Sequence, residues 1–162
     1  MFRLMAAAAL AAIAWTVPAH AEEHIVRMLN KGVDGIMVFE PGLLHIAPGD
    51  TVRFMPVDRG HNAETIAGMI PEGAAPFEGR LNEELVVSPE TDGLYAIRCK
   101  PHYAMGMVMI IAVGDAAQTA DFIGKRVPPR ARQRFETYLN ALWSNAGTWP
   151  AYRDEQWLQQ QR

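Results

Sequence analysis

The sequence predicts a mainly β protein, with eight strands in an antiparallel sandwich or barrel followed by two α-helices. From Glu23 to Val113, short apolar or alternating runs are separated by Gly, Pro, Asn and Asp residues, which is the pattern of strands joined by turns. After Asp115 the pattern changes to helix-permissive sequence. The chain shows no internal repeat.

Each expected strand is bounded by turn residues. Pro48-Gly49-Asp50 and Thr91-Asp92-Gly93 supply turns between neighbouring strands. The segment from Met69 to Leu81 has no clean period and contains two prolines and two glycines, so we expect a long connection of the kind that Greek-key folds need. The expected strands lie near residues 24–29, 36–39, 43–46, 51–55, 61–66, 83–88, 93–99 and 107–113.

Two helices are expected after the strands. Residues 116–125 are permissive for the first, and Pro129 suits the first turn of the second. In the second helix, apolar residues recur every three or four positions and share one face, which we expect to pack on the sandwich. This face consists of Ala131, Phe135, Tyr138, Leu139, Leu142 and Trp143.

Residues 1–21 have the features of a cleaved secretory signal peptide. Arg3 precedes the apolar stretch from Leu4 to Val17, and small residues follow up to Ala21. A membrane anchor is the alternative, but this stretch is shorter than the roughly 20 residues that a spanning helix needs. The 141 residues left after cleavage fit one domain with 14 basic and 18 acidic side chains, a balance that does not suggest nucleic-acid binding.

Cys99 is the single cysteine of a chain that we expect to be exported to an oxidising space. An inert buried thiol is one interpretation, but its neighbours favour another. The segment from Cys99 to Met107 places a thiol, the imidazole of His102 and the thioethers of Met105 and Met107 within nine residues. Thiolate and thioether groups suit Cu(I), and imidazole suits both copper oxidation states, so this segment indicates a copper site.

A copper site of this type needs two histidines, a cysteine and a long axial methionine bond, so a second histidine must come from elsewhere. His24 lies next to the new amino terminus and His45 lies inside a short apolar run, so both read as ordinary strand residues. His61 follows Gly60 at the start of a strand and can point from the end of a sheet, which makes it the better ligand. Spacing alone leaves open whether Met105 or Met107 is the axial ligand.

Several short motifs in this chain resemble those of the pseudoazurins, blue copper proteins of the cupredoxin family. The resemblance runs roughly from Glu22 to Ser144 and is specific, since the motifs agree in order and spacing. They are Lys31-Gly32, Met37 to Pro41, Pro48 to Val52, Gly60-His61-Asn62, Met69 to Gly73 and Cys99 to Met107.

The resemblance implies an eight-stranded Greek-key sandwich over residues 22–144 with two C-terminal helices. It also implies one copper ion bound by four ligands: His61, Cys99, His102 and Met107. Residues 145–162 extend beyond it, and their role as a docking element or a frayed end is left open. Asn62 is expected either to hold the Cys99 loop or to cap a local turn, and Met37 either to contact the exposed imidazole or to fill core space.

Four protein ligands leave no open position for a substrate, so we expect a single-electron carrier and not an enzyme. Family resemblance implies a bacterial periplasmic location, a monomer, and electron delivery to nitrite reductase, with nitrous oxide reductase or c-type cytochromes as further partners. A basic rim around the site would meet acidic partners, although these residues also fit ordinary solvated charges. The rim consists of Lys31, Arg59, Arg98 and Lys100.

Two rival functions use the same residues. A copper carrier or store would use the same soft ligands, but to deliver or hold copper and not to cycle between its oxidation states. A zinc enzyme would use His61, Cys99 and His102 with water in the fourth position. Lys100 departs from the commoner family pattern, in which a threonine follows the cysteine, and its charge is expected to raise the reduction potential.

Overall fold

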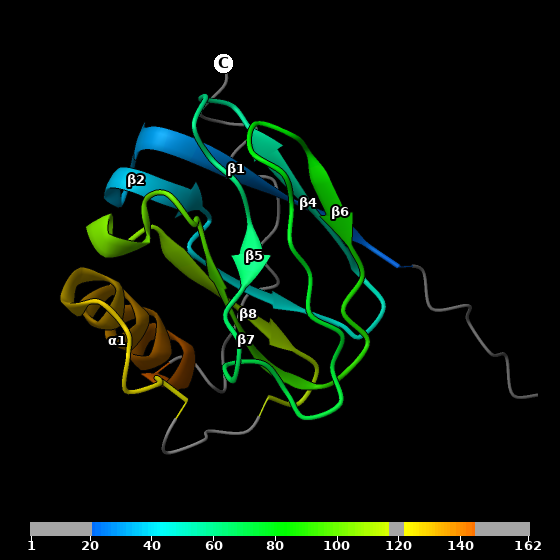
Figure 1. Ribbon diagram of the computed structural model, residues 1–162. Helices are drawn as coiled ribbons and strands as arrows, with labels where there is room; N and C mark the ends of the chain where they lie inside the picture. Colours follow the sequence, from blue (N-terminus) through cyan, green and yellow to red (C-terminus); the bar gives the residue numbers. More distant parts are fainter. Residues whose placement is uncertain (1–20, 117–121, 145–162) are drawn as a thin grey trace, which may run out of the picture.

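The computed structural model describes residues 21–116 and 122–144 and shows a sandwich of two four-stranded sheets with one helix packed beside it (Figure 1). One sheet has the strand order β2-β1-β4-β6 and the other has the order β3-β8-β7-β5. The mainly β prediction with eight strands is therefore confirmed. The strands are β1 (Glu23–Gly32), β2 (Gly35–Glu40), β3 (Leu43–Ile46), β4 (Thr51–Pro56), β5 (Glu64–Thr65), β6 (Leu85–Val87), β7 (Gly93–Arg98) and β8 (Val108–Val113).

The expectation of a purely antiparallel sandwich is wrong, because β1 pairs with β4 and β3 pairs with β8 in parallel. The reason lies in the path of the chain. After the β1–β2 hairpin the chain crosses to the second sheet as β3 and returns to the first as β4, so β4 runs beside β1 in the same direction. Turn residues set the ends of strands, but they do not determine such crossings.

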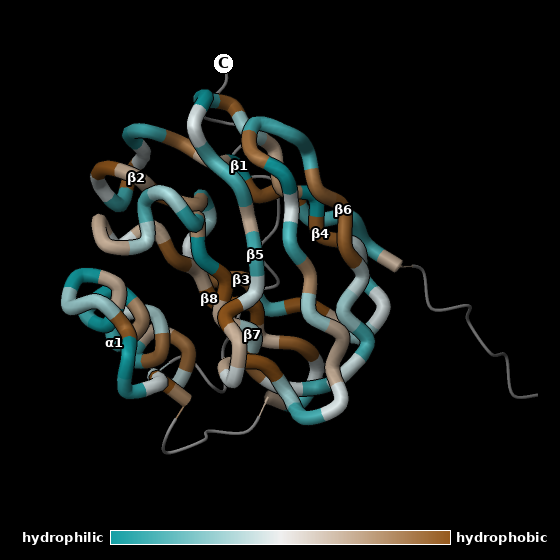
Figure 2. The backbone as a smooth tube through the Cα atoms, viewed as in Figure 1, coloured by the Kyte–Doolittle hydropathy of each residue, from teal (hydrophilic) through white to brown (hydrophobic). Residues whose placement is uncertain are grey.

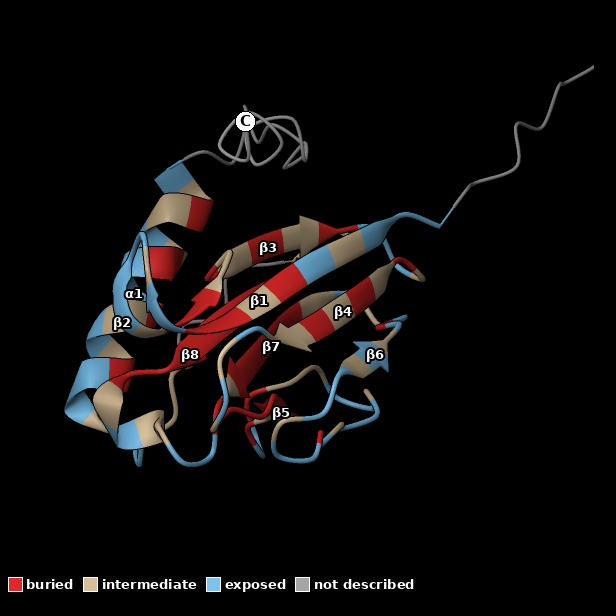
Figure 3. Ribbon diagram, turned by 90° about the horizontal axis from the view of Figure 1, so that it is seen from above, coloured by how far each residue is buried: buried red, intermediate tan, exposed pale blue. Residues whose placement is uncertain are grey.

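Strand β8 is buried along its whole length because both of its faces are covered (Figure 3). Met109, Ile111 and Val113 face the core between the sheets, together with Cys99 and Met107. The alternate residues of β8 belong to a second apolar cluster beneath the helix, which explains why this strand is a continuous apolar run and not an alternating one.

Helix α1 (Pro129–Ser144) covers the outer face of β8 with the apolar stripe predicted from the sequence. Ala131, Phe135, Tyr138 and Leu142 are buried on this face. Figure 2 shows the same division, with hydrophobic stretches of α1 turned toward the sheet and hydrophilic ones turned away. Burial of a side chain such as Phe135 contributes about 1.5–3 kcal/mol to folding.

The predicted first helix over residues 116–125 is not found in the part of the chain that the structure describes. Residues 117–121 lie outside it, and the described segment from Phe122 to Pro128 forms a bend and a turn. Gly124 and Pro128 disfavour a continuous helix there. Phe122 still reaches the core, where its ring meets Phe135 edge-on with 6.4 Å between centroids.

The long connection from Met69 to Leu81 is confirmed, and the strand β5 beside it is shorter than the predicted strand at 61–66. Thr65 exchanges hydrogen bonds with Phe77, and Glu64 forms an isolated bridge with Glu78, so the connection itself covers the free edge of β5. Two expectations lie outside the described residues: the signal peptide, apart from Ala21, and the extension at 145–162. Among the described residues, no helix is long and apolar enough to span a membrane.

Candidate metal centre

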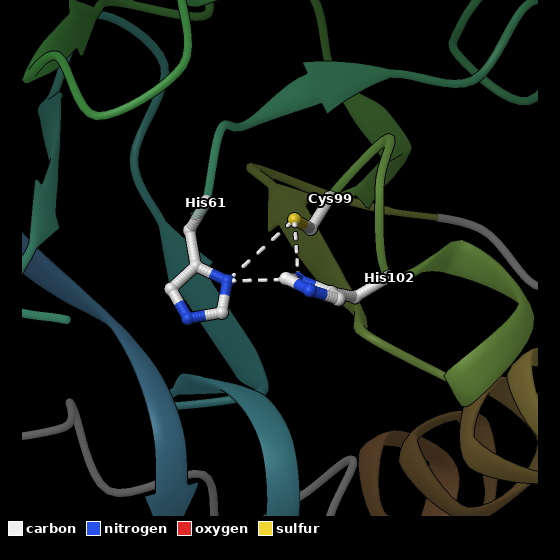
Figure 4. A group of neighbouring side chains, drawn as sticks. All are labelled: His61, Cys99 and His102. Carbon is white, nitrogen blue, oxygen red and sulfur yellow. Dashed lines mark hydrogen bonds between the residues drawn. The ribbon is translucent and has the colours of Figure 1, made fainter. Parts of the chain in front are cut away.

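Three potential metal ligands from two segments of the chain meet beside the loop between β7 and β8. His61 lies in the loop before β5, Cys99 directly follows β7, and His102 precedes the short 3-10 helix η1 (Tyr103–Met105). Cys99 Sγ lies 3.7 Å from His61 Nδ1 and 3.5 Å from His102 Nδ1, and the two nitrogens lie 3.1 Å apart (Figure 4). All three donor atoms therefore face one common point.

These distances fit a single metal ion. Donor atoms that surround a first-row metal at about 2.0–2.3 Å lie roughly 3–4 Å from one another. The donor set of one thiolate and two imidazoles is the trigonal arrangement of blue copper sites. His61 and Cys99 are fully buried, whereas His102 is half-buried, so only one of the three ligands reaches toward solvent.

Met107 and Met105 lie in different surroundings, which bears on the axial position that spacing left open. Met107 is fully buried in the same core cluster as Cys99, and main-chain hydrogen bonds join the two residues: Cys99 N–H donates to Met107 O at 3.0 Å. Met107 N–H in turn donates to His102 O at 3.2 Å. Met105 belongs to η1 and is only half-buried. Burial therefore favours Met107.

Burial also sets the protonation of the ligands. It raises the pKa of the Cys99 thiol, and hydrogen bonds from the main chain of Asn62 and His102 oppose this only in part. Burial lowers the pKa of His61, and the nearby charge of His102 lowers it further, while Asp58 acts in the opposite direction. His61 is thus held as a neutral imidazole, the form that binds metal ions.

Asn30 orients His61, and sequence reasoning missed this residue. Its side-chain oxygen lies 3.0 Å from His61 Nε2, an arrangement in which Nε2–H donates and Nδ1 keeps its lone pair free toward Cys99. Asn30 lies in β1, 31 positions before His61 in the sequence. It directly precedes the Lys31-Gly32 motif, but that motif does not show which side chain meets His61, so the contact depends on the strand β1 that brings Asn30 beside this loop.

A buried polar network supports Cys99 from the other side. The Asn62 side chain donates to Glu64 Oε2 and to Gly79 O, and its oxygen accepts the main-chain N–H of Lys100 at 2.8 Å. Glu64, which is only 4% exposed, also accepts hydrogen bonds from the Arg98 guanidinium at 2.7 Å. The interpretation of Asn62 as a residue that holds the Cys99 loop is confirmed.

The residues expected to form a basic rim differ in their partners. Arg98 pairs with Glu64, and Lys100 Nζ lies 3.2 Å from Glu78, so both charges are balanced within the chain. Lys31 and Arg59 are exposed. The other two histidines of the described chain are occupied elsewhere: His24 pairs with Asp50 at 3.0 Å and His45 Nε2 lies 2.9 Å from Gly114 O.

Comparison with known proteins agrees with this donor set. Residues 26–114 match the model of the copper binding proteins of the plastocyanin/azurin family. A pseudoazurin of Methylorubrum extorquens is 51% identical over 113 residues, which cover 69% of this chain and 76% of the relative. A pseudoazurin of Paracoccus pantotrophus is 42% identical over 136 residues, which cover 83% of this chain and 94% of the relative. The chain belongs to the pseudoazurin family.

Solved pseudoazurin structures share the architecture. The crystal structure of native pseudoazurin from Hyphomicrobium denitrificans superimposes with a TM-score of 0.68 at 41% identity, and the match covers 74% of this chain and 97% of that one. Membership of the pseudoazurin family makes copper the cofactor of this chain and single-electron transfer its general role.

Proposed function

We propose that His61, Cys99, His102 and Met107 bind one copper ion and that the protein carries single electrons between partner proteins in the periplasm. The convergence of His61 Nδ1, Cys99 Sγ and His102 Nδ1 within 3.7 Å of one another is the observation that carries this proposal. The burial of Met107 beside Cys99 supports its assignment as the axial ligand. Copper bound there would supply a centre that cycles between Cu(I) and Cu(II).

The protein residues contribute rigidity and a route for the electron. Asn30 fixes the ring of His61, and Asn62 fixes the main chain after Cys99, so two ligands are held before any metal binds. His102 is half-buried and lies between the buried thiol and the protein surface. Its outer edge is therefore the point at which an electron would enter or leave. A closed set of four protein ligands offers no position for a substrate.

The expected partners are nitrite reductases of the copper or haem type, with nitrous oxide reductase and c-type cytochromes as further candidates. Relatives named pseudoazurin support the class of role, and the chemistry of the site supports transfer through His102. Docking on a small surface around His102 would allow the partner to leave after one electron, as a monomeric carrier requires.

The decisive experiment is to load the mature protein with Cu(II) and to record its visible spectrum. A copper–thiolate charge-transfer band that ascorbate bleaches and air or ferricyanide restores is the expected result. A colourless complex would refute the proposal and favour zinc-like or purely structural binding. A coloured complex that transfers its copper to an acceptor protein but does not cycle would instead indicate a copper carrier or store.

A matched pair of variants tests the axial ligand. Met107→Leu should change the ratio of the charge-transfer bands and weaken copper binding, because it removes the buried thioether. Met105→Leu removes the same group two residues earlier and should leave both properties unchanged. The reverse result would assign the axial position to Met105.

A further inference from the structure

Arg134 of helix α1 binds main-chain carbonyl groups from two segments that lie far apart in the sequence. Its Nη1 donates to Gly106 O at 2.6 Å and to Met37 O at 2.9 Å, and its Nη2 makes a longer contact of 3.4 Å with Ile36 O. Hydrogen bonds with a charged donor are about twice as strong as neutral ones. One guanidinium thus joins α1, the start of β2 and the loop that carries Cys99, His102 and Met107.

The two shorter of these contacts are to carbonyl groups of residues with unusual backbone conformation. Gly106 has φ +90°, and Met37, which is not a glycine, has φ +49°. A non-glycine residue in this region costs roughly 1 kcal/mol or more and persists only where its surroundings hold it. Arg134 therefore contacts two of the points at which the backbone near the site has a positive φ.

Gly106 is also held by direct packing against the first turn of α1. A Cβ atom at this position would lie 3.2 Å from Arg130 O and 3.3 Å from Arg130 C, which is closer than ordinary contact. The helix therefore fits tightly over the residue that immediately precedes Met107. Since main-chain hydrogen bonds to His102 and Cys99 hold Met107 itself, the contact at Gly106 completes the support of this end of the loop.

We infer that Arg134 is a positioning residue for the copper site and sets the place of Met107 through the Gly106 carbonyl. The inference rests on the proposed function, in which Met107 is the axial ligand. The competing interpretation is that Arg134 only fastens α1 to the sandwich. Arg132 provides a matched control, because its Nη2 donates at 2.8 Å to Gly124 O, in the segment that leads into the same helix.

The experiment compares Arg134→Met, Arg134→Lys and Arg132→Met in the copper-loaded protein. Arg134→Met should raise the rate of copper loss to a chelator about ten-fold, as loss of groups that orient metal ligands typically does, and should change the ratio of the charge-transfer bands. Arg134→Lys keeps the charge but loses the fork of donors, and should show the same spectral change. Arg132→Met should leave the copper site unchanged. Equal effects of Arg134→Met and Arg132→Met on the copper site would overturn the inference.

A double-mutant cycle identifies the route of the effect. In a Met107→Leu background, Arg134→Met should no longer accelerate copper loss, because the residue through which Arg134 acts is gone. An undiminished ten-fold effect would overturn the inference.

In the copper-free protein, Arg134→Met should speed amide exchange at Met107. If the unsubstituted protein forms no charge-transfer band, the proposed function itself fails. If that band forms but Arg134→Met and Arg132→Met lose copper at the same rate, the proposed function stands and only the role of Arg134 fails.

Discussion

The side chain of Asn62 accepts the main-chain N–H of Lys100 at 2.8 Å, so the residue after His61 holds the residue after Cys99. These two ligands come from separate segments, 38 positions apart, and the bond between Asn62 and Lys100 is partly buried. This bond links the main chain after Cys99 to the residue after His61 without using the metal. It should therefore limit the rearrangement of these two ligands that a change of oxidation state would require.

We expect Asn62→Ala to weaken copper binding about ten-fold or more and to lower the free energy of unfolding by about 1–3 kcal/mol. It leaves the Lys100 N–H without its partner and removes a donor from Glu64 and Gly79. Chelator competition and urea unfolding of the copper-free protein measure the two effects. Asn62→Asp keeps the acceptor for the Lys100 N–H but places a second carboxylate beside Glu64. It should therefore lower the free energy of unfolding while changing copper affinity less than Asn62→Ala does. Unchanged copper affinity in Asn62→Ala would contradict the structural assignment.

The second prediction concerns the Glu64–Arg98 ion pair. The Glu64 side chain is 5% exposed and the Arg98 side chain 31% exposed, so Arg98→Met removes the nearest cation from a carboxylate that water reaches poorly. We expect a loss of about 2 kcal/mol in the free energy of unfolding, because hydrogen bonds to charged groups contribute about 1.5–3 kcal/mol.

The exposed pair of Arg80 and Glu83 is the control for this second prediction. Its atoms lie 4.0 Å apart with both side chains largely in solvent. Arg80→Met should therefore change stability by less than about 1 kcal/mol. Urea unfolding of the two variants at pH 7 makes the comparison, and equal losses would show that Glu64 does not depend on Arg98.

Features that depend on neighbouring residues could be predicted from the sequence. The strands follow from alternating or continuous apolar runs between turn residues, and the apolar face of α1 follows from its helical spacing. Three of the four proposed ligands lie between Cys99 and Met107, where soft donors within nine residues are a local signal. His61 needed the chemistry of the complete site as an additional argument.

Features that depend on distant segments could not be predicted in the same way. The parallel pairing of β1 with β4 results from a crossing between sheets, which turn residues do not encode. Asn30 contacts His61 across 31 positions and Arg134 contacts Met37 across 97, and the sequence around either residue does not reveal its distant partner. The rim prediction treated Arg98 and Lys100 as free charges because their acidic partners lie on other segments.

Tyr138 gives a prediction about pH. Burial raises the pKa of its hydroxyl to about 12; nearby Asp34 raises it, while Arg134 lowers it. The hydroxyl is buried without a hydrogen-bond partner. It packs so closely against Gly42 that a Cβ atom on that residue would clash with the hydroxyl oxygen. In the unfolded chain the tyrosine ionises near its ordinary pKa of 10.0. The un-ionised Tyr138 hydroxyl therefore makes its full contribution to the free energy of unfolding below pH 10. This contribution is lost between pH 10 and 12, by up to about 1.4 kcal/mol per pH unit.

Tyr138→Phe should remove this pH dependence and should not destabilise the protein at pH 7. Loss of an unpaired buried hydroxyl is neutral or stabilising by up to about 1 kcal/mol, because the packed ring remains. Urea unfolding at pH 7, 9 and 11 should show the variant gaining on the unsubstituted protein only at the highest pH. A constant difference across the three pH values would contradict the assigned cause.

The last prediction concerns the encounter with a partner. Lys31 directly follows Asn30, whose side chain contacts His61, and Arg59 lies two residues before His61. Both exposed charges are therefore close in sequence to a residue of the proposed copper site. Lys100 is balanced by Glu78, and Arg53, on β4, is balanced by Glu23 and Glu84. We expect Lys31→Gln and Arg59→Gln each to slow electron transfer to a copper nitrite reductase roughly two- to three-fold at low salt, because they weaken steering.

Arg53→Gln is the control and should leave the transfer rate unchanged, and Lys100→Gln should have a smaller effect than either rim variant. The differences should disappear as ionic strength rises toward about 1 M, where charges are screened within about 3 Å. Stopped-flow measurement of the bimolecular rate over this range tests both points. Rates that are independent of salt would show that charge does not steer the encounter. An equal loss in Arg53→Gln would show that the net charge of the protein, and not these two positions, governs it.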